Sequence, residues 1–179
     1  MPALERSFSE PLPARLYIDT DILLSATVRS EPHHARCADL LRLARQGGTV
    51  LYISTLSWLE YAHTVSRERF RQNLPEPIRR RFRLGRWQEA PVRATYLAAL
   101  IGEFERLLGY YEYEVMPISA QVRDLALTHM ARHALGSQDA VHLASAALAG
   151  VPDFASLDDA FRRVDGLLLW NDRVHGAGA

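Results

Sequence analysis

The chain has 179 residues, of which 48% are hydrophobic and 23% charged, and its basic and acidic side chains balance to a formal net charge of zero. These values are typical of one globular domain with a sizeable core. The single cysteine, Cys37, excludes a disulfide framework or a thiolate metal cage, and the absence of lysine excludes Schiff-base and P-loop lysine chemistry. No apolar run is as long as a membrane span, and the single cysteine suits a reducing compartment, so we expect a cytoplasmic protein.

Short apolar runs alternate with segments of helical periodicity along the chain. The expected strands are residues 15–19, 49–53, 111–116, 154–157 and 166–170. The expected helices are residues 20–31, 33–46, 54–65, 91–109, 119–133 and 137–149. Ser137 is the expected cap of the last helix. This alternation predicts one α/β domain with a mainly parallel sheet of about four or five strands.

The domain is expected to span residues 15–170, after an irregular arm over residues 1–14 and before a loose tail over residues 171–179. One segment, residues 66–93, is strongly basic, with nine arginines against three glutamates. Prolines interrupt this segment, and its centre, residues 78–84, is a candidate short helix. We interpret the segment as an insertion or helical protrusion.

Four acids occupy positions where the rim of a parallel sheet forms. Asp19 ends the first expected strand, Glu60 interrupts an apolar helix, Asp139 lies in a first helical turn and Asp158 follows the fourth strand. Ligands of open α/β sheets bind at the carboxyl ends of the strands, so these four side chains can converge there. Three of the acids also have a purely structural explanation: Asp139 suits a helix dipole, Asp158 a turn, and Glu60 a solvated helix stripe. Asp19 is the hardest to explain in this way.

Clustered carboxylates without thiolates suit a hard cation such as Mg²⁺ or Mn²⁺. Such an ion neutralises charge on a phosphoryl transition state and activates water. It also allows several carboxylates to share one pocket, since bare acids raise each other's pKa. The pattern therefore favours Asp19, Glu60, Asp139 and Asp158 as metal ligands over four unrelated acids.

The motifs that contain these acids resemble those of PIN-domain ribonucleases, most closely the VapC type of toxin. Four stretches carry the resemblance: Tyr17-Ile18-Asp19-Thr20-Asp21, Ser54-Thr55-Leu56-Ser57-Trp58-Leu59-Glu60, Asp139-Ala140-Val141-His142-Leu143-Ala144 and Ser156-Leu157-Asp158-Asp159-Ala160-Phe161. The order and approximate spacing agree over residues 15–170. The resemblance implies a three-layer α/β/α fold and metal-dependent endonucleolytic cleavage of RNA by Asp19, Glu60, Asp139 and Asp158.

The same resemblance implies partners. A VapC-type toxin would be a homodimer, would act on transfer or ribosomal RNA, and would pair with an antitoxin protein that blocks the site. There are departures from the family pattern. Asp21 stands where the family often has asparagine, so it either joins the site or caps a helix. Ser156 replaces a threonine, and Asp159 competes with Asp158 for the fourth acidic position.

Two further features allow more than one interpretation. Arginines in the basic segment could bind RNA phosphates, with Phe82 and Trp87 stacking on unpaired bases, or could form a solvated face or a dimer contact. The arginines concerned are Arg79, Arg80, Arg81, Arg83 and Arg86. His142 lies one turn after Asp139 and could hydrogen-bond it or a substrate, although a packing role is favoured.

Two alternatives to a nuclease remain. A haloacid-dehalogenase-like phosphatase also opens with a strand and an Asp-x-Asp pair, with Asp19 as nucleophile and Asp21 as general acid. That chemistry usually needs a lysine, and it leaves Glu60 without a role. The second alternative is a catalytically silent PIN-like domain that only binds RNA or protein. Four retained acids argue against it, because idle buried acids cost stability.

Overall fold

The computed structural model describes residues 2–73 and 93–172. The strands are β1 (Leu4–Arg6), β2 (Arg15–Ile18), β3 (Val50–Ser54), β4 (Tyr113–Met116), β5 (Asp153–Ala155) and β6 (Leu168–Trp170). The helices are α1 (Thr20–Thr27), α2 (His34–Gly47), α3 (Leu56–Asn73), α5 (Arg93–Leu108), α6 (Ala120–His133), α7 (Ser137–Leu148) and the 3-10 turn η2 (Asp159–Arg163). Among these described residues, no helix is both long enough and apolar enough to cross a membrane.

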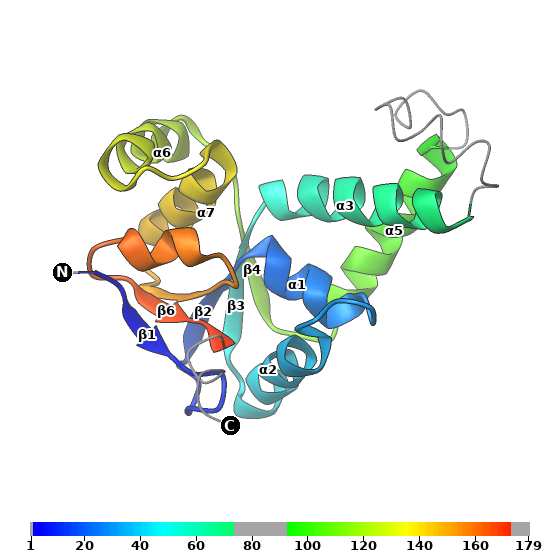
Figure 1. Cartoon of the computed structure of the whole chain (residues 1–179), viewed down its shortest axis with the longest axis horizontal. Helices are drawn as coiled ribbons and strands as arrows, with labels where there is room; N and C mark the ends of the chain where they lie inside the picture. Colours follow the sequence, from blue (N-terminus) through cyan, green and yellow to red (C-terminus); the bar gives the residue numbers. More distant parts are fainter. Residues whose placement is uncertain (1, 74–92, 173–179) are drawn as a thin grey trace.

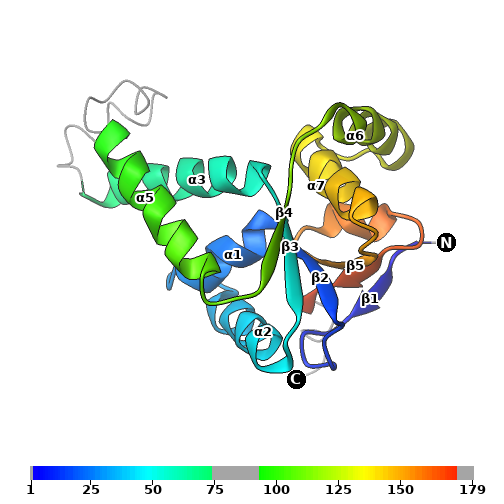
Figure 2. The same cartoon turned by 180° about the vertical axis from the view of Figure 1, so that it is seen from behind.

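The strands form one parallel sheet with helices on both faces, which confirms the expected three-layer α/β/α class. Helices α1, α2, α3 and α5 cover one face, and α6 and α7 cover the other (Figures 1 and 2). Strand β2 lies between two apolar cores because its side chains alternate. Leu16 and Ile18 pack into the first core, whereas Tyr17 packs into the second.

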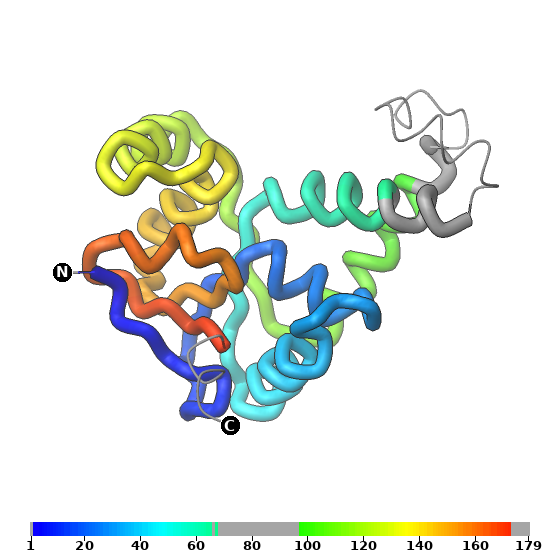
Figure 3. The backbone as a smooth tube through the Cα atoms, viewed as in Figure 1, coloured from blue at the N-terminus to red at the C-terminus, as the bar shows by residue number. Residues whose placement is uncertain are grey.

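The order of the strands creates a crevice beside β2. The sheet runs β1-β6-β5-β2-β3-β4 in the described chain, and every neighbouring pair is parallel. The chain moves outward from β2 through β3 to β4, and then returns to place β5 on the other side of β2, as the tube in Figure 3 shows. Ligands of such sheets bind where the strand order reverses, outside the carboxyl ends of the strands. Here that point lies between the ends of β2 and β5.

The N-terminal segment differs from the prediction. Residues 1–14 were expected to be an irregular arm, but Leu4–Arg6 forms strand β1 and pairs in parallel with Leu168–Trp170. The described sheet therefore has six strands instead of four or five. The strand was not predicted because several prolines lie nearby in residues 1–14. The three residues themselves contain no proline, and an edge strand needs only one partner.

Helix boundaries also depart from the prediction. Helix α1 was expected over residues 20–31 but ends at Thr27. Helix α3 was expected to end near Val65 but continues to Asn73, so the first part of the basic segment extends this helix. Ser137 was expected to cap α7, but the cap is Gly136 and Ser137 is the first helical residue. The expected short helix at residues 78–84 and the five arginines, Phe82 and Trp87 lie outside the described residues.

Candidate active site

The four predicted acids line one cavity of about 510 Å³ at the crevice between β2 and β5. Asp19 directly follows β2, Glu60 projects from α3, Asp139 from the first turn of α7, and Asp158 from the loop after β5. Four segments that are distant in the sequence therefore contribute to the same wall. The crevice is where a parallel sheet of this topology binds its ligands.

Asp19 is the most tightly held of the acids. It is only 7% exposed and is the N-cap of α1, where its Oδ1 accepts a hydrogen bond of 2.7 Å from the Thr20 N–H. Its Oδ2 accepts a second bond of 2.8 Å from the Ser156 hydroxyl. Burial raises the pKa of Asp19 and the charge of Glu60 adds to the effect, against the opposing charge of His142. A buried carboxylate whose ionised form is disfavoured in this way is typical of a cation ligand.

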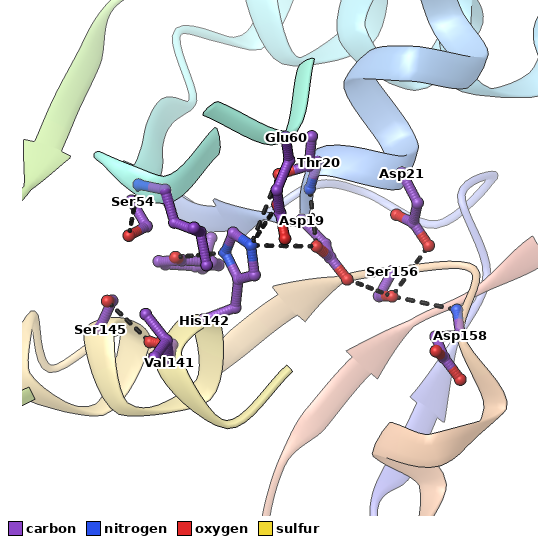
Figure 4. Close-up of polar contacts among 12 residues, drawn as sticks. Asp19, Thr20, Asp21, Ser54, Glu60, Val141, His142, Ser145, Ser156 and Asp158 are labelled. Atoms are coloured by element: carbon purple, nitrogen blue, oxygen red, sulfur yellow. Dashed lines mark hydrogen bonds and ion pairs between the residues drawn. The ribbon is translucent and has the colours of Figure 1, made fainter. Parts of the chain in front are cut away.

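Glu60 shares its carboxylate with two donors. Its Oε2 accepts a hydrogen bond of 2.5 Å from the Thr20 hydroxyl and lies 2.8 Å from Nε2 of His142 (Figure 4). Burial alone would raise the pKa of Glu60, but the hydrogen bond and charge of His142, helped by Thr20, outweigh it and lower the pKa. Glu60 is therefore held ionised and aimed at Asp19.

His142 belongs to the site, and sequence reasoning favoured only a packing role for it. The side chain is almost fully buried, and its Nε2 faces Oε2 of Glu60 at 2.8 Å and Oδ1 of Asp19 at 3.7 Å. Burial lowers the pKa of His142, but the charges of Asp19 and Glu60 outweigh burial and raise it. The possible hydrogen bond to Asp139 is not among the described contacts of His142, whose partner is Glu60. The available signal was the position of His142 one helical turn after Asp139.

Asp139 and Asp158 form the outer part of the wall. Asp139 is the third residue of α7, and its carboxylate accepts a hydrogen bond from the backbone N–H of the cap residue Gly136. Burial raises the pKa of Asp139, and the charge of Asp158 adds to it. Asp158 is exposed and caps η2 through a 2.7 Å bond from the N–H of Ala160. Both acids thus serve the local structural roles considered above and also face the cavity.

Asp21 and Asp159 have different positions. Asp21 lines the cavity, and its Oδ2 accepts bonds from the Leu157 N–H at 2.8 Å and the Ser156 hydroxyl at 3.1 Å. Its buried Oδ1 has no hydrogen-bond partner, and burial with the nearby charge of Asp19 raises the pKa of Asp21 well above its usual range. Asp159 instead pairs with Arg162 at 3.3 Å and is not part of the cavity wall.

The donor set fits a divalent cation. One carboxylate oxygen each of Asp19 and Glu60 and a ring nitrogen of His142 lie within 4.8 Å of one another. The unpartnered oxygen of Asp21 and the raised pKa values of three neighbouring acids indicate an excess of negative charge that a cation would neutralise. Oxygen-rich sites of this kind suit Mg²⁺ or Mn²⁺.

The pKa shifts of Glu60 and His142 predict how stability depends on pH without metal. The lowered pKa of Glu60 stabilises the fold above its ordinary pKa of about 4.3, and that contribution is lost as the pH falls through the lowered value. The raised pKa of His142 stabilises the fold below its ordinary pKa of about 6.5, and that contribution is lost as the pH rises through the raised value. We therefore expect the melting temperature in EDTA to be highest between about pH 4.5 and 6.5.

The raised pKa values of Asp19 and Asp21 also lower the stability as the pH rises, because the free-energy cost of burying these two carboxyl groups grows as they ionise. Thermal melts from pH 4 to 9 in EDTA measure this, and His142→Gln should flatten the decline at alkaline pH. A melting temperature that rises from pH 6.5 to 8.5 in the wild type would contradict the expectation.

Comparisons with known proteins agree with this geometry. The family model described as "PIN domain" matches residues 16–167. The fold is similar to VapBC2 from Rickettsia felis bound to a promoter DNA fragment, at 14% identity and a TM-score of 0.55, covering 88% of this chain and 98% of that one. It is also similar to a toxin–antitoxin complex from Klebsiella pneumoniae, at 17% identity and a TM-score of 0.51, covering 86% and 95%.

No curated protein matches the sequence. The PIN match spans most of the chain and includes the four acids and His142. It also excludes the phosphatase as the family of this protein. The chain belongs to the PIN domain family.

Proposed function

We propose that the protein is a Mg²⁺- or Mn²⁺-dependent endoribonuclease that hydrolyses RNA phosphodiester bonds in the acidic cavity. The observation that carries the proposal is the convergence of Asp19, Glu60, Asp139 and Asp158, from four separate segments, on one cavity at the strand crossover. Membership of the PIN family supports nuclease chemistry over a silent binding domain. The energetic cost of burying Asp19 supports it too.

The residues have distinct tasks in this reaction. A bound divalent cation would supply a Lewis acid that neutralises phosphate charge and makes water more acidic. Asp19 and Glu60 would bind it, since Asp19 is buried, Glu60 is half-buried, and both are oriented by hydrogen bonds and adjacent. Asp139 and Asp158 lie farther out, where they would orient the attacking water and accept its proton. The raised pKa of Asp139 suits proton transfer nearer neutrality.

The similarity to two toxin–antitoxin structures supports a biological role. We infer that the protein is the toxin of a VapC-type pair, acts in the cytoplasm on transfer or ribosomal RNA, and is a homodimer blocked by a cognate antitoxin. The arginines at positions 79–86, which lie outside the described residues, would contact RNA phosphates. This contact would be sensitive to salt.

RNA cleavage by the purified protein tests the proposal. Total cellular RNA incubated with Mn²⁺ should yield discrete fragments, and EDTA should abolish them. If intact RNA binds but is never cut with either metal, the silent binding domain is the better description. Release of phosphate from small monoesters, with phosphate trapped on Asp19, would instead indicate the phosphatase chemistry.

The alanine variant of Gly136 should impair cleavage without unfolding the protein. The backbone of Gly136 accepts any residue, at φ −62° and ψ 161°, but an added Cβ would lie 2.9 Å from Oδ2 of Asp139. The carboxylate must therefore move, and a displacement of about 1 Å can cost about 10²-fold in rate. We expect kcat to fall about 10- to 100-fold.

A matched control is Gly47→Ala at the end of α2, where the nearest atom to an added Cβ is 4.0 Å away. That variant should cleave like the wild type. Equal activity of both variants would show that the position of Asp139 does not matter.

A further inference from the structure

His142 has the geometry of a metal ligand. His142 is 1% exposed, it lines the cavity, and its Nε2 points at the oxygens that Asp19 and Glu60 turn toward each other (Figure 4). We propose that Nε2 of His142 coordinates the divalent ion together with Asp19 and Glu60, which makes the site a mixed nitrogen and oxygen site selective for Mn²⁺ over Mg²⁺. This inference rests on the proposed metal-dependent function.

The spacing of the donors suits a single ion. Neighbouring ligands of an octahedral ion at 2.0–2.1 Å lie about 3.0 Å apart. Nε2 lies 2.8 Å from Oε2 of Glu60 and 3.7 Å from Oδ1 of Asp19, and all three donors fall within 4.8 Å of one another. A small opening of this triangle would place an ion between them. Coordination would displace the proton that Nε2 now shares with Glu60 to solvent.

The second ring nitrogen of His142, Nδ1, has the kind of partner that metal-bound histidines have. These usually donate their second ring N–H to an oxygen, which fixes the tautomer and leaves the other nitrogen for the metal. Nδ1 of His142 lies 3.0 Å from the hydroxyl oxygen of Tyr17, a side chain that is itself fully buried. The hydroxyls of Ser145 and Ser54 also hydrogen-bond with the Tyr17 hydroxyl.

Metal binding through Nε2 requires the ring proton on Nδ1. The hydroxyl oxygen of Tyr17, 3.0 Å from Nδ1, is placed to accept that proton. The network leaves Nε2 as the nitrogen that faces Glu60 and Asp19.

A nitrogen ligand has a consequence for the choice of metal. Mg²⁺ binds through oxygen ligands and keeps several waters, whereas imidazole is a ligand of transition-metal ions. His142 should therefore improve binding of Mn²⁺ more than binding of Mg²⁺. In His142→Gln we expect Mn²⁺ affinity to fall about 10- to 100-fold, with a smaller loss of Mg²⁺ affinity.

Pulsed electron paramagnetic resonance of the Mn²⁺-loaded full chain tests the assignment directly. A nitrogen bonded to Mn²⁺ gives a strong hyperfine coupling that changes when histidine is labelled with ¹⁵N. Two histidines, His63 and His142, line the described cavity. The coupling should be present in the wild type, persist in His63→Gln and vanish in His142→Gln. Because His142→Gln could misfold, the wild type and His63→Gln together already decide the question.

Bound Mn²⁺ without a directly bonded nitrogen, or a coupling lost in His63→Gln instead, would overturn the assignment while leaving the nuclease proposal intact. If the wild type binds no Mn²⁺ or Mg²⁺ by calorimetry, the metal-dependent function fails first, and the ligand assignment falls with it.

Discussion

Replacing Asp19 with asparagine is expected to reduce RNA cleavage by about 10³-fold or more while the fold is retained. Asp19 contributes a buried carboxylate to the group of Asp19, Glu60 and His142 that we propose binds the metal. A metal ion supplies several kcal/mol of charge stabilisation to the transition state, which corresponds to about 10³-fold in rate. The amide keeps one oxygen to accept from the Thr20 N–H, so the cap of α1 should survive.

The same variant should be more stable than the wild type in EDTA. The raised pKa of Asp19 means that its ionised form is disfavoured in the fold, and the neutral amide removes that penalty above the ordinary pKa of the acid. Stability gained at the expense of activity is common at sites that concentrate like charges.

Asp159→Asn is the matched control for Asp19→Asn. Asp159 is an exposed acid near the cavity, but it pairs with Arg162 and does not line the wall. The Asp159→Asn variant should cleave RNA like the wild type, and its free energy of unfolding should differ from that of the wild type by no more than about 0.5 kcal/mol. Retained cleavage in Asp19→Asn, measured as single-turnover rates on one defined RNA, would remove Asp19 from the mechanism.

Truncating Phe154 to alanine should produce the largest loss of stability, about 3–5 kcal/mol in the free energy of unfolding. Phe154 is fully buried in β5, where its ring stacks on Tyr17 at 5.0 Å between centroids and contacts Phe161 at 4.6 Å. The variant leaves a cavity between the sheet and η2 that these rings cannot close without leaving their rotamers.

The loss should also reach the active site. Tyr17 holds Nδ1 of His142, so removal of the ring stacked on Tyr17 loosens the support of His142 and Glu60. Urea titration in EDTA measures the stability. Leu127→Ala on α6, a side chain 58% exposed, should stay within about 0.5 kcal/mol of the wild type. A loss below 1 kcal/mol in Phe154→Ala, on the order of a surface substitution, would show that this core does not organise the site.

Local sequence patterns were sufficient for the parallel sheet and for the placement of the acids. Asp19 and Asp158 could be predicted because each follows a strand whose apolar residues mark it clearly, and the carboxyl ends of parallel strands share one rim. Glu60 was recognisable as a charge within an apolar helix. The role of each as a metal ligand remains a prediction.

The remaining features depend on contacts between distant residues, which local patterns do not encode. His142 meets Glu60 across 82 positions, and Asp21 meets the backbone of Leu157 across 136. Strand β1 exists because β6 offers it an edge, not because Leu4–Arg6 has a strong pattern of its own. The cap of α7 is Gly136 instead of Ser137, and the Asp139 carboxylate accepts a hydrogen bond from the Gly136 N–H.

A titration with Mn²⁺ that follows site occupancy and RNA cleavage in the same samples tests whether bound metal is what cleaves RNA. We predict no cleavage in EDTA, a cleavage rate that rises in proportion to occupancy, and neither tight Mn²⁺ binding nor cleavage in Asp19→Asn. Cleavage that persists in EDTA, or a fully occupied site that leaves every cellular RNA intact, would contradict it.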